Sequence, residues 1–220
     1  MKLTVKDTDG SDSDTNKKTT KKTTTTTESD STSKYVYIGR LGFPGTEEGQ
    51  VLEPTDLTID TQNNMIYVAD KDNNRIDVFN TTGNYVTSWG SEGSGKGQFR
   101  QPGDIAADFS EGVVFVSEIG NNRIQKFDTD GNFLGMWGST GKGLGQFDHA
   151  GDIDLDNKQK VVYVTDIGNH RIQKFDYDGK LISSWGAQGV GDGQLDRPAG
   201  LTYDPSGIVF VADTKNNRIQ

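Results

Sequence analysis

Short apolar segments separated by turn residues recur along the chain from about residue 35 onward. Four of them, MIYVAD, VVFVSE, VVYVTD and IVFVAD, are rich in Val, Ile, Phe and Tyr. Segments of this kind, divided by Asn-Asn, Asp-Gly or Thr-Gly pairs, predict strands that are joined by tight hairpins. No window shows a sustained period of 3.6 residues, so the pattern predicts an all-β fold.

The predicted strands are organised into a tandem repeat. A Trp-Gly pair and an Arg-Ile pair mark it, at Trp89, Trp137 and Trp185 and at Arg75, Arg123, Arg171 and Arg218. Their spacings are 48, 48 and 47 residues. Each unit contains four short strand-like segments, and four strands at such a period are typical of propeller blades. We therefore expect a β-propeller of four-stranded antiparallel blades.

A longer pattern in these units resembles a known repeat. VADKDNNRIDVF, VSEIGNNRIQKFDTDGN and VTDIGNHRIQKFDYDGK are similar to NHL repeats, and the resemblance covers about residues 35–220. It implies a six-bladed propeller in which YIGRLG, at residues 37–42, is an outer strand. Six blades need about 288 residues, whereas residues 35–220 supply 186. We expect about four blades of a partial six-bladed ring, truncated at the C-terminus, with a closed four-bladed ring as the alternative.

The first 34 residues differ in composition from the rest. They hold 11 Thr, 7 Lys and 6 acidic residues. A segment this polar cannot bury enough apolar surface to fold, so we expect a disordered Thr-rich linker. Its start, KLTVKDTDGSDSDT, resembles the end of a PKD-type immunoglobulin-like domain. That resemblance implies an extracellular or cell-surface protein.

Charge and cysteine content narrow the choice of partners. Subtracting the linker from 23 basic and 32 acidic residues leaves 16 and 26, so residues 35–220 carry a charge of -10. An acidic body repels phosphate backbones, and we expect no nucleic-acid partner. No apolar run is long enough for a membrane span. The absence of Cys excludes a RING domain and thiol catalysis.

Two sets of repeated residues are expected to hold the scaffold together. One set consists of an acid and an Arg five residues apart: Asp70 and Arg75, Glu118 and Arg123, Asp166 and Arg171, Asp213 and Arg218. The two side chains flank a hairpin turn, where they can pair directly or the acid can bind the turn amides. The other set consists of Trp89, Trp137 and Trp185, whose rings can span the wedge between blades. Equal repetition in every unit indicates structure rather than catalysis.

A third set of repeated residues suggests a site. Asp56, Asp104 and Asp152 begin three successive inner strands, and the fourth unit has Gly200 there. Blade topology would place these carboxylates at one mouth of the channel, where hard oxygen ligands suit calcium or another cation. The side chains can instead accept hydrogen bonds from loop amides. No other cofactor is indicated.

These patterns favour a noncatalytic binding module for a protein, peptide or glycan. The polar turns that would face the partner are Lys71–Asn74, Ile119–Asn122, Ile167–His170 and Thr214–Asn217. Loops on a rigid scaffold commonly carry binding functions. We also expect open blade faces to make this chain associate or aggregate.

Three other functions remain as alternatives. A calcium-dependent lactonase-like propeller could use Asp56, Asp104 and Asp152. A lyase similar to peptidyl-amidoglycolate lyases would need His after the Pro position, which here holds Thr55, Gly103, Gly151 and Ala199. The NHL module of a ubiquitin ligase or RNA-binding protein is disfavoured by the missing Cys and the acidic body.

Overall fold

The computed structural model describes residues 39–220, and the predictions made for residues 1–38 lie outside this range. All the described strands belong to the compact unit Leu41–Gln220. Apart from one short 3-10 helix, η1 (Thr214–Asn216), the described elements are strands. The all-β prediction is confirmed. The described residues contain no helix that could cross a membrane.

Three sheets have four antiparallel strands each, in chain order. The first contains β3 (Pro54–Asp60), β4 (Met65–Asp70), β5 (Arg75–Asn80) and β6 (Tyr85–Trp89). The second contains β7 (Pro102–Asp108), β8 (Val113–Glu118), β9 (Arg123–Asp128) and β10 (Phe133–Trp137). The third contains β11 (Ala150–Asp156), β12 (Val161–Asp166), β13 (Arg171–Asp176) and β14 (Leu181–Trp185). The fourth sheet has three strands, β15 (Gly200–Asp204), β16 (Ile208–Asp213) and β17 (Arg218–Ile219).

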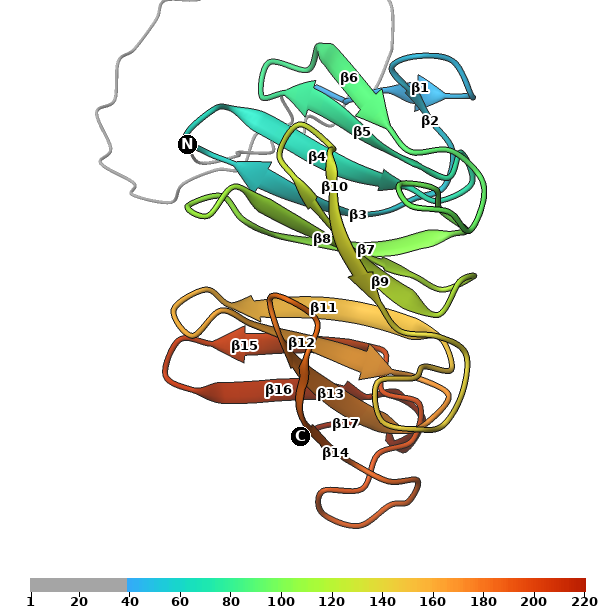
Figure 1. Ribbon diagram of the computed structural model, residues 1–220, viewed down its shortest axis with the longest axis vertical. Coiled ribbons are helices and arrows are strands. Elements are labelled where there is room, and N and C mark those ends of the chain that lie inside the picture. Colours follow the sequence, from blue (N-terminus) through green and yellow to red (C-terminus); the bar gives the residue numbers. More distant parts are fainter. Residues whose placement is uncertain (1–38) are drawn as a thin grey trace, which may run out of the picture. The chain divides into compact units, whose positions relative to one another are not determined.

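The sheets stack like the blades of a propeller, as predicted. Their first strands lie side by side in the order β3, β7, β11 and β15 (Figure 1). The first and fourth sheets stand at opposite ends of this row in Figure 1. The described residues therefore form an open row of blades, and not the closed four-bladed ring that the sequence left as an alternative.

The core lies between the sheets because strand residues alternate between two faces. In β8, Val114 and Val116 join a buried cluster that contains Tyr67 of the first sheet. Val113 and Phe115, on the other face of β8, join a cluster with the third sheet. Each inner interface is thus an apolar contact between one sheet and the next.

Two of the three tryptophans bridge neighbouring sheets. The Trp89 ring centroid lies 4.5 Å from that of Phe127 in the second sheet, and Trp137 lies 5.8 Å from Phe175 in the third. A Cβ on Gly131, where φ is +84°, would collide with the Trp89 indole, so this turn requires glycine. Trp185 instead packs edge-on against Tyr163 of its own sheet.

The segment before β3 differs from the sequence prediction. Residues 39–42 form no strand, so the expected outer strand at residues 37–42 is absent from its described part. They lead into a loop with a short parallel pair, β1 (Phe43–Pro44) and β2 (Gln50–Val51). Parallel bridges recur at the equivalent places of the three later loops between sheets. Residues 42–51 therefore have the form of an interblade loop, because they share its Gly-rich spacing.

Candidate functional site

Each predicted acid–arginine pair is an ion pair at the turn between the second and third strands of its sheet. The Nε atoms of Arg171 and Arg218 lie 2.7 Å from Oδ2 of Asp166 and Asp213. Arg123 pairs with Glu118, and Arg75 lies 3.6 Å from Asp70. All four carboxylates are buried. Buried charges need such partners, because the desolvation of an unpaired carboxylate raises the free energy of the folded state by roughly several kcal/mol.

The arginines also fix the interblade loops. Arg123 donates to the carbonyl oxygens of Ser94 at 2.6 Å, Gly95 at 2.9 Å and Gln98 at 2.7 Å. Equivalent bonds from the other arginines reach the other loops. Asn121 adds a bond from its side-chain amide to the Gly93 carbonyl at 2.9 Å. Turn and loop are therefore one rigid unit at the same end of every sheet.

The interblade loops share a frame and differ at their tips. In the loop before β7, the Gln98 side chain accepts a hydrogen bond from the Gly95 amide at 2.9 Å, and a Cβ on Gly93 would collide with it. Two exposed positions at the tips change from loop to loop. The first is occupied by Thr46, Ser94, Lys142 and Val190, and the second by Glu48, Lys96, Leu144 and Asp192. We call this end of the sheets, with its loops and turns, the loop face.

In the first three sheets, the last residue of the turn between the second and third strands binds the segment that leads into the next sheet. Asn74, Asn122 and His170 have positive φ, and each accepts a hydrogen bond from a main-chain amide of the next sheet. The His170 ring Nδ1 accepts the Arg197 amide at 3.2 Å. His149, the other histidine, supplies the amide that Asn122 accepts at 2.6 Å. Both histidines therefore have structural contacts in the turns.

A cavity opens on the loop face between the first and second sheets. It has a volume of about 360 Å³ and is lined mainly by polar side chains, among them Lys71, Asn74, Glu92, Arg100 and Gln101. Lys71 forms an ion pair with Glu53 at 3.0 Å. Charges of both signs border this cavity, so it suits a ligand with donors and acceptors rather than a simple anion.

The three predicted calcium-site aspartates lie along the inner strands and link the sheets. Oδ2 of Asp56 accepts the Ile105 amide at 3.1 Å, and Oδ2 of Asp104 accepts the Ile153 amide at 2.8 Å. Asp152 accepts the Leu201 amide in the same way. Each carboxylate thus binds an amide of the next sheet, not of its own loop. We call these three bonds the carboxylate clamps.

The protonation of the clamps bears on metal binding. Burial, followed by the negative charges of Asp152 and Asp56, raises the pKa of Asp104 to about 9. Burial also raises the pKa of Asp152. Calcium binds ionised carboxylates, and a cation beside these groups would lower their pKa values. Among residues 39–220 no three His, Cys, Asp or Glu side chains are placed to hold a metal ion, and the calcium site stays a prediction.

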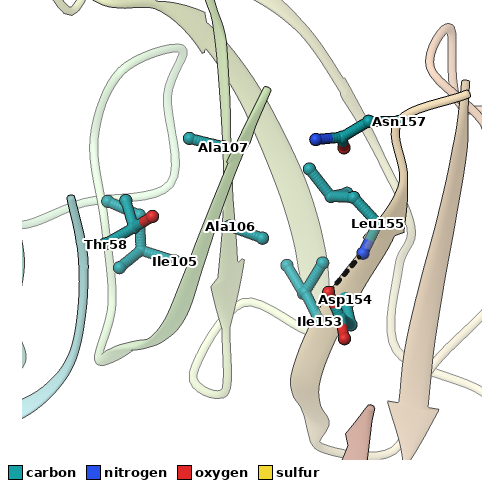
Figure 2. Close-up of a pocket in the computed structure, with 8 residues that line it drawn as sticks. All are labelled: Thr58, Ile105, Ala106, Ala107, Ile153, Asp154, Leu155 and Asn157. Atoms are coloured by element: carbon teal, nitrogen blue, oxygen red, sulfur yellow. Dashed lines mark hydrogen bonds between the residues drawn. The ribbon is translucent and has the colours of Figure 1, made fainter. Parts of the chain in front are cut away.

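A second cavity, of about 220 Å³, lies against the inner strands β3, β7 and β11. Figure 2 shows Ala106 pointing toward the side of Leu155, whereas Ala107 points toward the side of Thr58. Asp154 binds the amides of Leu155 and Tyr203, both at 2.7 Å. Sequence reasoning missed this cavity, although the signal was present: the register that holds Asp154 in the third sheet holds alanine in the second.

The first sheet departs from the others at one buried position. Gln125 and Gln173 each donate to the acid of their own sheet and accept a loop amide. Asp77 occupies the equivalent place, is fully buried, and its Oδ1 has no hydrogen-bond partner. Burial and the adjacent Asp70 raise the pKa of Asp77 to about 7. A carboxylate cannot donate the bond that the glutamine amide provides.

Replacing Asp77 with Gln is expected to stabilise the protein by about 2 kcal/mol at pH 8. In the native state Asp77 holds its proton between about pH 4 and pH 7, where the unfolded chain has lost it. Stability therefore falls as the pH rises through this window, and Asp77→Gln removes that slope. Urea unfolding at several pH values measures both effects. Gln173→Asp is the matched reverse change, and an unchanged profile in both variants would contradict this account.

Two family models match the sequence. A six-bladed β-propeller model matches residues 57–128, and an NHL-repeat model matches residues 195–220. No curated protein matches the chain.

Solved structures match the described fold. A streptogramin B lyase has a TM-score of 0.64 at 17% identity, over 83% of this chain and 54% of its own. A chain of a nidogen/laminin complex has a TM-score of 0.56 at 20% identity, over 72% of this chain and 56% of its own. The present chain thus spans little more than half the length of either, and identities this low show the fold alone. The stacked antiparallel sheets show a β-propeller fold, to which the six-bladed propeller model is similar over residues 57–128 and the NHL-repeat model over residues 195–220.

Proposed function

We propose that this chain is a noncatalytic binding propeller whose loop face holds a protein, peptide or glycan, in an extracellular or cell-surface protein. The observation that carries the proposal is the contrast within the loops. Buried Asp or Glu side chains, with partly or fully buried Arg and Asn side chains, repeat in every sheet and bind one another and the loop backbone, whereas the exposed tips differ in charge, size and polarity. A constant frame with variable exposed tips is suited to recognition.

The comparisons support this proposal only through the fold. A protein of the same fold stands in a nidogen/laminin complex, so a propeller of this kind can form part of a protein assembly. Lyase activity belongs to the other neighbour, and its 17% identity carries no catalytic residue to this chain. A lactonase-like activity would need a set of metal ligands, whereas among residues 39–220 no three His, Cys, Asp or Glu side chains are placed to hold a metal ion.

The test is a screen of immobilised peptides and glycans with the whole chain. Ligands that bind are measured again with a loop-tip variant, Lys142→Ala, Leu144→Ser and Val190→Ser, all exposed. A control variant carries Val86→Ser, Leu134→Ser and Ile182→Ser, three exposed positions on the outer strands. We expect the loop-tip variant to lose at least about tenfold in affinity, equal to roughly 1.4 kcal/mol, and the control to bind normally.

Three outcomes would contradict the proposal. The first is an equal loss of affinity in the two variants, which would place the contact elsewhere. The second is the absence of any bound peptide or glycan. The third is calcium-dependent hydrolysis of aryl lactones, which would favour the lactonase-like enzyme.

A further inference from the structure

The turn between β5 and β6 contains Asn80, Thr81 and Thr82 in succession. An Asn with Ser or Thr two positions later is the acceptor sequence for N-linked glycosylation, provided that the residue between them is not Pro. No other Asn in the sequence has Ser or Thr at that place. A motif this short needs support from its surroundings, and the geometry of the turn supplies it.

The Asn80 side chain uses its oxygen to cap the turn. Oδ1 accepts the main-chain amides of Thr82 at 3.1 Å and Asn84 at 2.9 Å, and the Thr82 hydroxyl at 2.7 Å. A main-chain amide only donates, so the atom that accepts two of them is the oxygen, and Nδ2 is the other terminal atom. Within residues 39–220, Nδ2 has no hydrogen-bond partner. The nitrogen that would carry a glycan is therefore available.

Access to this turn does not depend on what precedes the first sheet. The equivalent turns of the second and third sheets each have a preceding sheet beside them. Asp128 and Asp176 occupy the register of Asn80 there, and both remain partly exposed. Asp178, in the register of Thr82, has a side chain that is 91% exposed. A sheet packed in front of the first one would thus leave Asn80 and Thr82 accessible.

The stability of the turn does not account for an Asn at position 80. In the second sheet, Oδ1 of Asp128 accepts the amides of Asp130 at 3.0 Å and Asn132 at 2.8 Å, and Oδ2 accepts the Asn132 side chain at 2.8 Å. Burial raises the pKa of Asp128, but these hydrogen bonds outweigh it and hold the pKa below its usual range. An ionised carboxylate is therefore the better acceptor for this turn. The first sheet has an amide instead, and its nitrogen adds no contact.

We propose that Asn80 carries an N-linked glycan. The glycosyl donor is an oligosaccharide bound through C1 to a lipid diphosphate. Nδ2 of Asn80 forms a bond to C1, and the bond from C1 to the diphosphate oxygen breaks. The lipid diphosphate leaves with the bonding electrons, and the Nδ2 proton passes to a base of the transferase. The inference rests on the extracellular or cell-surface location in the proposed function, because this modification occurs on exported chains.

The position of the glycan is compatible with ligand binding at the loop face. Arg75 begins β5 at the loop face, and Asn80 ends the same strand. A glycan on Asn80 therefore stands at the opposite end of the first sheet. It adds a bulky hydrophilic group there and leaves the loop tips free.

Mass spectrometry of the secreted protein tests the site. The whole chain is exported from eukaryotic cells behind a secretion signal and digested with trypsin, which cuts after Arg75 and Lys96 and so separates Asn80 from the Thr-rich first 34 residues. Peptide N-glycanase converts a glycosylated Asn to Asp, which identifies the modified position. We expect a glycan on Asn80. It should be lost in Asn80→Gln and Thr82→Ala and kept in Thr82→Ser.

A matched gain of the site is possible in the second sheet. Asp128→Asn together with Asp130→Thr gives residues 128–132 the same sequence as residues 80–84. We expect this variant to carry a second glycan, at position 128. Asn80→Asp keeps the capping oxygen that the other sheets use, and it replaces Asn80→Gln if that variant is not secreted. The parent chain without the secretion signal is the unmodified control.

Two results would overturn the site itself. They are a secreted parent chain with a bare Asn80, and a glycan that persists on Asn80 in Thr82→Ala. Neither result bears on the location of the protein, which is tested by fractionating the source cells with an antibody to the chain. A cytosolic chain with a bare Asn80 would overturn the location, and with it the native modification, even where the secreting host attaches a glycan.

Discussion

Replacing Arg123 with Ala is expected to destabilise the protein by about 3–4 kcal/mol. Arg123 is nearly buried, and its removal leaves the fully buried Glu118 carboxylate without its cation. The change also removes the donors to Ser94, Gly95 and Gln98, so the loop before β7 should lose its fixed shape. Urea unfolding followed by tryptophan fluorescence measures the loss.

Two further variants sharpen this prediction. Arg218 makes the same contacts at the end of the row, but its side chain is 28% exposed, so Arg218→Ala should cost only about 1 kcal/mol. Adding Glu118→Gln to Arg123→Ala should recover part of the loss, because the buried negative charge is then gone. Equal losses at Arg123 and Arg218 would show that burial does not set the strength of these pairs.

Replacing Asp104 with Asn is expected to stabilise the protein at neutral and alkaline pH, by on the order of 2 kcal/mol. The pKa of this carboxyl is about 9 in the folded protein against a usual 3.8. Between these values the native state holds a proton that the unfolded chain releases. Stability therefore declines as the pH rises from about 4 to 9. Asn cannot ionise, so the decline should be much shallower.

The same experiment tests the clamp itself. Asn keeps a side-chain oxygen for the Ile153 amide, which Asp104 now binds at 2.8 Å, whereas Ala leaves that amide without its acceptor. We expect Asp104→Ala to be less stable than Asp104→Asn by about 1–2 kcal/mol at every pH. Unfolding free energies measured from pH 5 to pH 9 give the comparison. An Asn variant that keeps the full pH slope would rule out Asp104 as its source.

The sequence predicted the strands, the repeat and the stacking of sheets because these depend on local patterns. In β8, for example, four consecutive apolar residues place Val113 and Phe115 on one face of the strand and Val114 and Val116 on the other, so both faces are apolar. The tryptophan wedge followed from the size of the ring and its regular spacing. Trp185 differed because β17 of the fourth sheet, Arg218–Ile219, has no residue in the register of Phe127 and Phe175.

The clamps could not be predicted from the same patterns. The partner of Asp104 is a main-chain amide 49 residues later, and any residue type supplies such a group. The sequence therefore shows the carboxylates of Asp56 and Asp104 but not that Oδ2 of each accepts an amide of the next sheet. The cavity beside Ala106 was missed because it results from the small size of the alanine side chain at a position where the third sheet has Asp154. The exceptional residue Asp77, by contrast, can be recognised in the sequence, because the first unit has RIDVF where the second and third have RIQKF.

The contacts of the repeated arginines have a consequence for how this chain can change over time. Arg123 and its counterparts bind carbonyl oxygens of the loops, which every amino acid possesses, and no side chain at the variable tips. Substitution at a tip therefore leaves the fold intact, provided that the loop keeps its length and its glycines. The residues that hold the fold and the residues at the exposed tips are therefore separate sets, and each of the loops can diverge without the others.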